Sequence, residues 1–158
     1  MQRQLRRQNG FSLLEVLIST VVLAIGLLGI AALQANAIRY NQSAQLRSIA
    51  VAQISNMIDR LVANPTGVTA GFYNSVTGIP AMPSCTTCSA SEIALRDTNE
   101  WNTANRLLLP SGQGTITRNG NQFVITIRWD NARTGAAGLG CSGDADVDLT
   151  CLAMEVVI

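Results

Sequence analysis

Four cysteines and ten acidic residues are the side chains of this sequence that could ligate a metal or act as acids and bases, because its 158 residues include neither His nor Lys. The chain therefore has no imidazole base, no histidine metal ligand and no lysine that could form a Schiff base. Walker-type and dinucleotide-binding glycine patterns are also missing from the sequence. We therefore expect a protein that is not an enzyme and that uses no cofactor.

The cysteines are Cys85, Cys88, Cys141 and Cys151. They could form disulfides, ligate zinc or, in the pair Cys85-x-x-Cys88, carry out redox chemistry. A thioredoxin-like pair is expected to open a helix after a strand in a βαβ unit, and the sequence predicts no such unit. An exported location and nine residues between Cys141 and Cys151 argue against zinc. An even number of cysteines outside the hydrophobic segment favours disulfides in an oxidising compartment, with three possible pairings.

Alternating acids give a second pattern, with Asp144, Asp146 and Asp148 followed by Glu155 at the twelfth position counted from Asp144. This spacing imitates a calcium-binding loop, in which carboxylate oxygens surround the ion. However, Leu149 stands where the turn of such a loop requires glycine. The favoured interpretation is a solvated acidic loop before a strand, with calcium binding as the alternative.

Glu15 is an acid inside the most apolar part of the chain. The first ten residues are polar and include three arginines, and the sequence then becomes apolar at Phe11. Residues 16–38 carry no formal charge and, at about 1.5 Å per residue, can cross a bilayer core of roughly 30 Å as a helix. A carboxylate in such a segment costs roughly 2.5–3.5 kcal/mol on insertion scales. Glu15 is therefore expected to have a partner and a purpose.

The distribution of charge sets the expected orientation in the membrane. Basic residues before the apolar run place the N-terminus on the cytoplasmic side and the body of the chain outside. A secretory signal peptide cut near 31–32 or 35–37 is one alternative, but it would have a shorter apolar stretch. An ordinary signal anchor is another, but it does not explain Glu15. Without the first ten residues, eight arginines remain against ten acids, so the net charge changes from +1 to −2. A nucleic-acid partner is therefore not expected.

The stretch GFSLLEV, residues 10–16, resembles the prepilin motif of type IV pilins and pseudopilins. In that family a membrane-embedded aspartic peptidase cuts after the glycine and methylates the new N-terminal residue. The resemblance implies cleavage between Gly10 and Phe11, N-methylation of Phe11, and a mature chain in which Glu15 is the fifth residue. The new amine can then neutralise the Glu15 carboxylate of a neighbouring subunit and offset its desolvation.

An amphipathic stretch follows the apolar run. Its apolar residues recur at spacings of three and four, at Leu46, Ile49, Ala50, Ile54, Met57, Ile58 and Leu61. No proline interrupts residues 11–63, and Asn64-Pro65 followed by Gly67 supplies the stop. We predict one helix of about fifty residues, of which 11–38 form the transmembrane and assembly segment and 39–63 bury one face.

Residues 64–158 are expected to form a globular head domain. Residues 64–89 are rich in turn-forming types and predict an irregular connection. Ser89 and Glu92 fit a capping box, which predicts a second helix from Ala90 to about Leu108. The apolar contacts of that helix are expected from Ile93, Leu95, Trp101, Ala104, Leu107 and Leu108.

The Asn119-Gly120-Asn121 turn predicts a hairpin, because alternating apolar residues flank it. Phe123, Ile125, Ile127 and Trp129 share one face of its second strand. A last strand is predicted over 149–158, and its core-facing residues are expected to be Leu152, Met154, Val156 and Ile158. The fold class is α+β, with a long N-terminal helical spine and a small antiparallel sheet packed on its C-terminal half.

The runs VLAIGLLGIAALQ, MIDRLVANPTG, LLLPSGQGTI and VITIRWD resemble the PilV type of minor pilin. This resemblance implies a low-abundance subunit that primes pilus assembly near the filament tip, in a machine that serves twitching motility and cell adhesion. Its implied partners are the prepilin peptidase, other minor pilins and the major pilin, with a tip adhesin as a further candidate. The implied location is the bacterial inner membrane and then the extracellular pilus. The pairing Cys85–Cys88 with Cys141–Cys151 is favoured, because pilins often close a C-terminal loop in this way.

Two other functions share parts of this pattern. A minor pseudopilin of a type II secretion system would have the same motif and architecture. A membrane-anchored periplasmic binding or redox protein would share the anchor alone and would not be shortened by prepilin peptidase.

Overall fold

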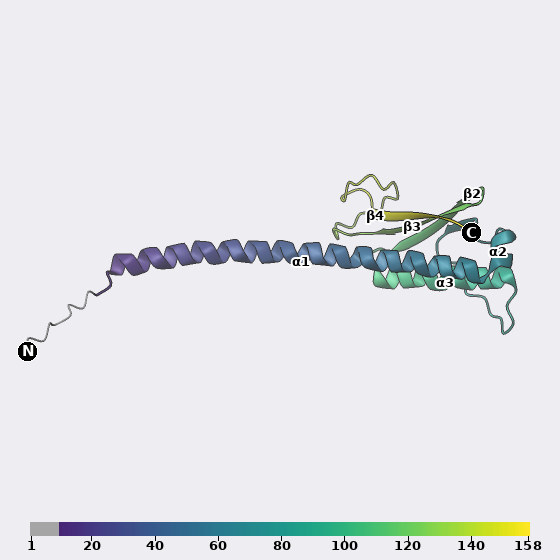
Figure 1. Cartoon of the computed structure of the whole chain (residues 1–158), viewed down its shortest axis with the longest axis horizontal. Coiled ribbons are helices and arrows are strands. Elements are labelled where there is room, and N and C mark those ends of the chain that lie inside the picture. The colour runs from purple at the N-terminus through teal and green to yellow at the C-terminus, as the bar shows by residue number, and fades with distance from the viewer. Residues whose placement is uncertain (1–9) are drawn as a thin grey trace, which may run out of the picture. The chain divides into compact units, whose positions relative to one another are not determined.

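The computed structural model describes residues 10–158, and the predicted basic leader, apart from Gly10, lies outside the described residues. Its elements are α1 (Leu13–Ala63), α2 (Pro65–Thr69), β1 (Ser75–Thr77), α3 (Ala90–Leu108), β2 (Gln113–Asn119), β3 (Gln122–Trp129) and β4 (Thr150–Val157). The predicted α+β fold, with a long N-terminal helix and a small antiparallel sheet, is confirmed (Figure 1). The chain divides into two compact units, one up to Gln42 and one from Ser43 to Ile158.

Helix α1 has 51 residues and ends one residue before Asn64, as the proline stop predicts. The Asn64 side chain then accepts a hydrogen bond from the Gly67 N–H at 3.1 Å and caps α2, in which Pro65 takes the first position. The predicted irregular connection over 64–89 is therefore wrong in part, since it contains α2 and β1. Proline at a first helical position starts a helix as readily as it ends the one before.

The core of the second unit lies between the C-terminal part of α1 and the sheet. The four fully buried residues of α1 keep the predicted spacing: Ala50, Ile54, Met57 and Leu61. The predicted inner face of β3 is also confirmed, because each of its four apolar side chains has no exposed surface: Phe123, Ile125, Ile127 and Trp129. The partly buried Leu46, Ile49 and Ile58 of α1 pack against the edge of this core. The amphipathic pattern of residues 39–63 thus has a direct structural counterpart.

The four strands follow the order β1-β2-β3-β4, and every neighbouring pair is antiparallel. The predicted hairpin joins β2 and β3, with Asn119 opposite Gln122. Gly120 occupies the turn with φ +62°, in the left-handed region where glycine carries no steric penalty. The predicted last strand forms β4 and pairs along its whole length with β3.

Helix α3 begins and ends as predicted, but several of its expected core contacts are wrong. Leu95, Leu107 and Leu108 are 45%, 79% and 50% exposed. The buried stripe of α3 instead follows the helical spacing through Ala94, Asp97, Thr98, Trp101, Asn102 and Asn105. This face can be polar because its side chains bond to neighbouring elements, including Trp101 to the Gln53 carbonyl at 2.8 Å and Asn102 to the Gly114 N–H at 2.7 Å.

A second correction concerns β4. Leu152, Val156 and Ile158 pack against the core, as predicted, but Met154 is 39% exposed. Strand β4 forms one end of the sheet, so its inner-face side chains lie at the margin of the core. Their counterparts on β3 are completely buried because they have a strand on each side. Alternation along a strand identifies a face, but it cannot say which strand is at the edge.

Gly114→Ala should weaken the head, because a Cβ at this position would overlap the Trp101 ring and lie 2.6 Å from the Asn105 amide nitrogen. Overpacking of this kind typically costs about 1–3 kcal/mol. The measurement is denaturant unfolding followed by tryptophan fluorescence, since both tryptophans lie in this unit. Thr117→Ala, at an exposed position of the same strand, serves as the control. Equal stability of the two variants would show that the helix and strand can separate without cost.

Ser89→Ala should destabilise α3 by about 1 kcal/mol, because the Ser89 hydroxyl caps the helix and accepts from the Glu92 N–H at 3.4 Å. Hydrogen bonds from Ser89 hold the pKa of Glu92 below its ordinary value of 4.5. A lowered folded-state pKa stabilises the protein above the ordinary pKa, and this contribution is lost as the pH falls through the folded value. In the variant the Glu92 pKa should rise. An NMR titration of the carboxyl, with Thr86→Ala as control, would detect this.

Candidate processing and assembly segment

The first described residues form an extended entry into α1, and Ser12 sets the point at which the helix begins. The Ser12 carbonyl accepts from the N–H groups of Glu15 at 3.0 Å and Val16 at 3.3 Å, and its hydroxyl accepts from the Leu14 N–H at 3.3 Å. Serine is a favoured residue at this position because its oxygen satisfies a donor that the helix leaves unpaired. Gly10 and Phe11 precede the helix, and Phe11 is 84% exposed. The Gly10–Phe11 bond is therefore in non-helical backbone that a peptidase can reach.

The part of α1 up to Gln42 is apolar on all sides, and no other described part of the chain covers it. Every described residue up to Gln42 is exposed, including Leu13 at 91% and Leu28 at 72%. Within the described chain, this is the one helix long and apolar enough to cross a membrane. Exposure of so much apolar surface to water is very unfavourable, at roughly 25 cal/mol per Å². The segment needs a membrane or other apolar helices around it.

Glu15 is the one carboxylate in this part of α1. It contributes to an open groove with Phe11, Val16, Ser19, Thr20 and Leu23. The Ser19 hydroxyl donates to the Glu15 carbonyl at 2.7 Å, and the Thr20 hydroxyl donates to the Leu17 carbonyl at 2.8 Å, so both bond to the helix backbone. No described residue forms an ion pair or hydrogen bond with the Glu15 carboxylate. This geometry leaves the carboxylate free to accept a cation from outside the chain.

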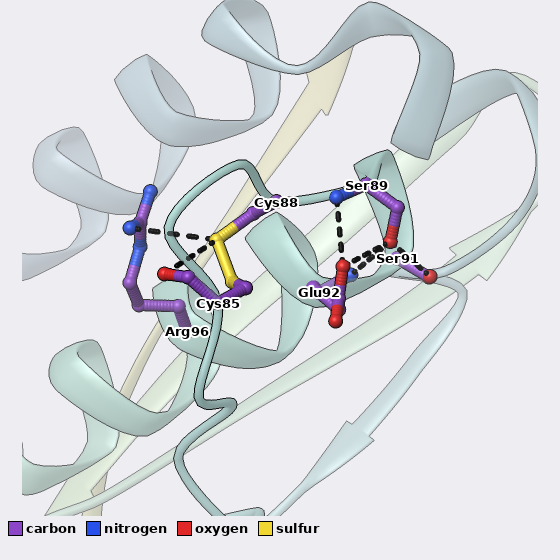
Figure 2. Close-up of a disulfide and its surroundings, with 6 residues drawn as sticks. All are labelled: Cys85, Cys88, Ser89, Ser91, Glu92 and Arg96. Carbon is purple, nitrogen blue, oxygen red and sulfur yellow. Dashed lines mark hydrogen bonds between the residues drawn. A yellow bond between two sulfur atoms is a disulfide. The ribbon is translucent and has the colours of Figure 1, made fainter.

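The cysteines form two disulfides within the second unit. Cys85 and Cys88 are bonded with their Cα atoms 5.2 Å apart, and Cys141 and Cys151 with their Cα atoms 5.7 Å apart. The first lies immediately before α3, where Figure 2 shows it beside the capping box of Ser89 and Glu92. The second joins the loop after β3 to the start of β4. No free cysteine remains in the part of the chain that the structure describes.

The four carboxylates of the calcium pattern do not come together. Within residues 10–158, no group of three or more acidic or cysteine side chains is placed to hold a metal ion. Asp148 accepts from the N–H groups of Gly140 and Ser142, each at 3.0 Å, while Glu155 lies on β4 and accepts from the Gln122 amide at 2.7 Å. Bonds from Ser142 and Gly140 lower the pKa of Asp148. These acids therefore hold a loop and a strand in place.

A buried polar network in the head was not predicted from the sequence. The Asp97 carboxylate accepts from the Tyr73 hydroxyl at 2.6 Å and from the Arg60 guanidinium at 3.0 Å. Arg60 also pairs with Glu100 at 2.8 Å, and Asn64 donates to the Tyr73 hydroxyl at 3.0 Å. Burial, together with the bond to Asp97, raises the pKa of Tyr73, so the phenol remains a neutral donor. The network joins α1 to α3, which run side by side in Figure 1.

The spacing of residues along α3 was the one feature of the sequence that pointed to this network. Asp97 lies four residues before Trp101, so both belong to the same face of α3. A search for apolar residues alone passes over such a position. Tyr73 gave no comparable signal, because it lies in a turn whose contacts depend on the fold.

Comparison with protein-family models finds one match, in which residues 5–31 fit the prokaryotic N-terminal methylation motif. The matched stretch includes Gly10, Phe11 and Glu15 and extends along the exposed apolar part of α1. Comparison with curated proteins and with solved structures gives no match. The motif, the long helix and the small antiparallel sheet together support a prepilin of the type IV pilin and pseudopilin kind, processed by a peptidase at its N-terminus.

Proposed function

We propose that this chain is a minor type IV pilin, a structural subunit that primes pilus assembly near the filament tip. The observation that carries the proposal is the methylation motif at the start of α1, whose apolar N-terminal part is exposed up to Gln42. Such a helix is stable in a bilayer before assembly and among the helices of other subunits afterwards. The role is structural because the helix offers surface for packing, while the buried polar groups of the head bond its own elements together.

Processing prepares the subunit for assembly. Prepilin peptidase removes residues 1–10 by cutting after Gly10, and Phe11 becomes the N-methylated first residue. The new cationic amine then meets the Glu15 carboxylate of a neighbouring subunit inside the bundle of helices. An ion pair formed there offsets the cost of burying both charges. Residues 11–38 are thus the membrane and assembly segment, 39–63 the amphipathic second half of the helix, and 64–158 the globular head.

The assignment to minor pilins of one type rests on sequence resemblance alone. Several runs of the sequence resemble minor pilins of the PilV type, including MIDRLVANPTG at the end of α1 and VITIRWD in β3. We therefore propose other minor pilins and the major pilin as its partners, with a tip adhesin as a further candidate. The subunit would wait in the inner membrane with its N-terminus in the cytoplasm and then enter the extracellular pilus. A minor pseudopilin of a type II secretion system is the alternative, because it would carry the same methylation motif.

Deletion of the gene distinguishes a role in the type IV pilus from a role in a type II secretion system. The proposal predicts few or no surface pili and loss of twitching, with exoprotein secretion unchanged, and restoration of pili by the intact gene. Loss of exoprotein secretion with normal pili would contradict it and establish the pseudopilin role. In cells with pili, gold-labelled antibody against the head should mark filament ends. Labelling distributed along the shaft would contradict the tip position.

A further inference from the structure

The Cys85–Cys88 disulfide lies in surroundings that differ from those of the Cys141–Cys151 disulfide. In the first, the Arg96 guanidinium donates toward Cys88 Sγ at 3.8 Å from two turns further along α3. Figure 2 shows Arg96 directed at this sulfur, while the Glu92 carboxylate is held by Ser89. The sulfur thus faces a cation, and the nearby anion is engaged with the capping residue. A sulfur beside a cation leaves more readily as a thiolate.

The position of Cys88 along the chain also favours its thiolate. Cys88 immediately precedes Ser89, the capping residue of the 19-residue helix α3. The N-terminus of a helix carries partial positive charge from its unpaired N–H groups, which favours a nearby anion. Helix N-termini and neighbouring arginines both lower the pKa of a cysteine and so stabilise its thiolate.

The sizes of the two closed loops point in the same direction. Cys85 and Cys88 are three positions apart in sequence, whereas Cys141 and Cys151 are ten apart. A disulfide stabilises a fold in part by restricting the unfolded chain, and this contribution grows with loop length. The smaller loop therefore gives its bond less protection against reduction. All four cysteines are partly exposed, so access alone does not distinguish the two bonds.

From these contacts we infer that Cys85–Cys88 is an exchange-competent disulfide that reacts with the dithiol of a protein oxidoreductase, whereas Cys141–Cys151 is structural. A thiolate of the dithiol attacks Cys85 Sγ, a new S–S bond forms, and the Cys85–Cys88 bond breaks. Its electron pair goes to Cys88 Sγ, which leaves as a thiolate beside Arg96. The second thiol of the oxidoreductase then attacks the mixed disulfide, and its proton is transferred to the departing Cys85 sulfur. Two electrons pass to the cysteine pair, and the reverse sequence forms the bond.

The inference does not depend on the role in pilus assembly, and its test needs only the full-length chain in detergent. The chain is equilibrated at pH 8 with mixtures of reduced and oxidised dithiothreitol, free thiols are alkylated, and each cysteine is assigned by mass spectrometry. Cys85 and Cys88 should become reduced at a lower ratio of reduced to oxidised reagent than the other pair. Reduction of Cys141–Cys151 first, or of both pairs together, would overturn the inference.

Arg96 is a positioning residue in this scheme, and its replacement tests the cause. Arg96→Gln should lower the equilibrium constant for reduction of Cys85–Cys88 by about threefold, while Arg96→Lys retains most of it. Arg106→Gln, which removes an exposed arginine from the same helix, is the matched control and should change nothing. If Arg96→Gln has the same equilibrium constant for reduction as wild type, the guanidinium does not stabilise the Cys88 thiolate.

A separate experiment shows which of the two sulfurs, Cys85 Sγ or Cys88 Sγ, is attacked. Brief exposure to reduced glutathione should place the glutathione mainly on Cys85 and leave Cys88 as the free thiol, because Cys88 is the better leaving group. In Arg96→Gln this preference should weaken. Glutathione found mainly on Cys88, or on Cys141 or Cys151, would contradict the mechanism.

Discussion

Glu15→Leu should give a precursor that is still shortened by its peptidase but scarcely enters filaments. Leucine suits the apolar segment better than a carboxylate, so membrane insertion should not suffer. The loss falls on assembly, where the cationic amine of a neighbouring subunit would have no carboxylate to pair with. Breaking a buried ion pair by removing one partner typically costs about 3–5 kcal/mol, which corresponds to a decrease of about a hundredfold or more in incorporation. Quantitative immunoblotting measures this incorporation as the amount of the subunit in sheared filaments relative to the amount in whole cells.

Two controls make this result specific. Ser19→Ala removes a nearby hydroxyl that bonds to the helix backbone, and it should leave incorporation close to wild type. Glu15→Asp keeps the charge on a shorter side chain and should retain part of the function. Normal incorporation of Glu15→Leu would mean that the carboxylate does not pair with the amine of a neighbouring subunit.

Asp97→Ala should cost the head about 3 kcal/mol or more. The side chain of Asp97 is 12% exposed and accepts hydrogen bonds from both Arg60 and Tyr73. Its removal leaves the buried Tyr73 hydroxyl without its acceptor and takes from Arg60 the less exposed of its two carboxylate partners. Denaturant unfolding of the detergent-solubilised chain, followed by tryptophan fluorescence, measures the change.

Glu100→Ala is the matched control for Asp97→Ala, because it removes the other carboxylate that pairs with Arg60. The Glu100 side chain is 43% exposed, and exposed ion pairs contribute at most about 1 kcal/mol. Asp97→Asn keeps the shape and one acceptor oxygen, so its cost should fall between the two. Similar losses from Asp97→Ala and Glu100→Ala would show that the network stabilises the head only through surface charge.

The sequence predicted those parts of the fold in which one periodicity dominates. Apolar spacing placed Ala50, Ile54, Met57 and Leu61 on the buried face of α1, and alternation placed the inner face of β3. The Ser89–Glu92 box placed the start of α3, and Asn64-Pro65 placed the end of α1. In each case the local pattern and the tertiary contacts favour the same structure.

The wrong predictions lie where tertiary contacts decide. Leu107 and Leu108 are apolar but exposed, while Asn102 and Asn105 of the same helix are buried because Asn102 binds the backbone of β2 and Asn105 binds Asn102. Composition assigns such positions to the wrong face, since a buried amide depends on partners that are distant in sequence. The acidic pattern, for which calcium binding is only the alternative interpretation, illustrates a related limit. Its spacing was nearly right, but Glu155 belongs to a strand that takes it away from the acidic loop.

The candidate assembly segment was the most predictable part of the chain, because its chemistry is local. Gly10, Phe11 and Glu15 lie within six consecutive residues, and their significance depends on the apolar helix that follows. The structure adds that Ser12 begins the helix and that the bond before Phe11 is in exposed, non-helical backbone. The partner that we propose for Glu15 belongs to another subunit, so the structure of one chain does not contain it.

Processing at Gly10–Phe11 is the step that we propose to convert a membrane precursor into a filament subunit. Its most direct test is the intact mass and N-terminal sequence of the chain, purified from cells with and without prepilin peptidase. We predict a product that begins at Phe11 and carries one added methyl group when the peptidase is present, and an unshortened, unmethylated precursor when it is absent. A chain that keeps residues 1–10 in the presence of active peptidase, or that is cut elsewhere, would contradict the account.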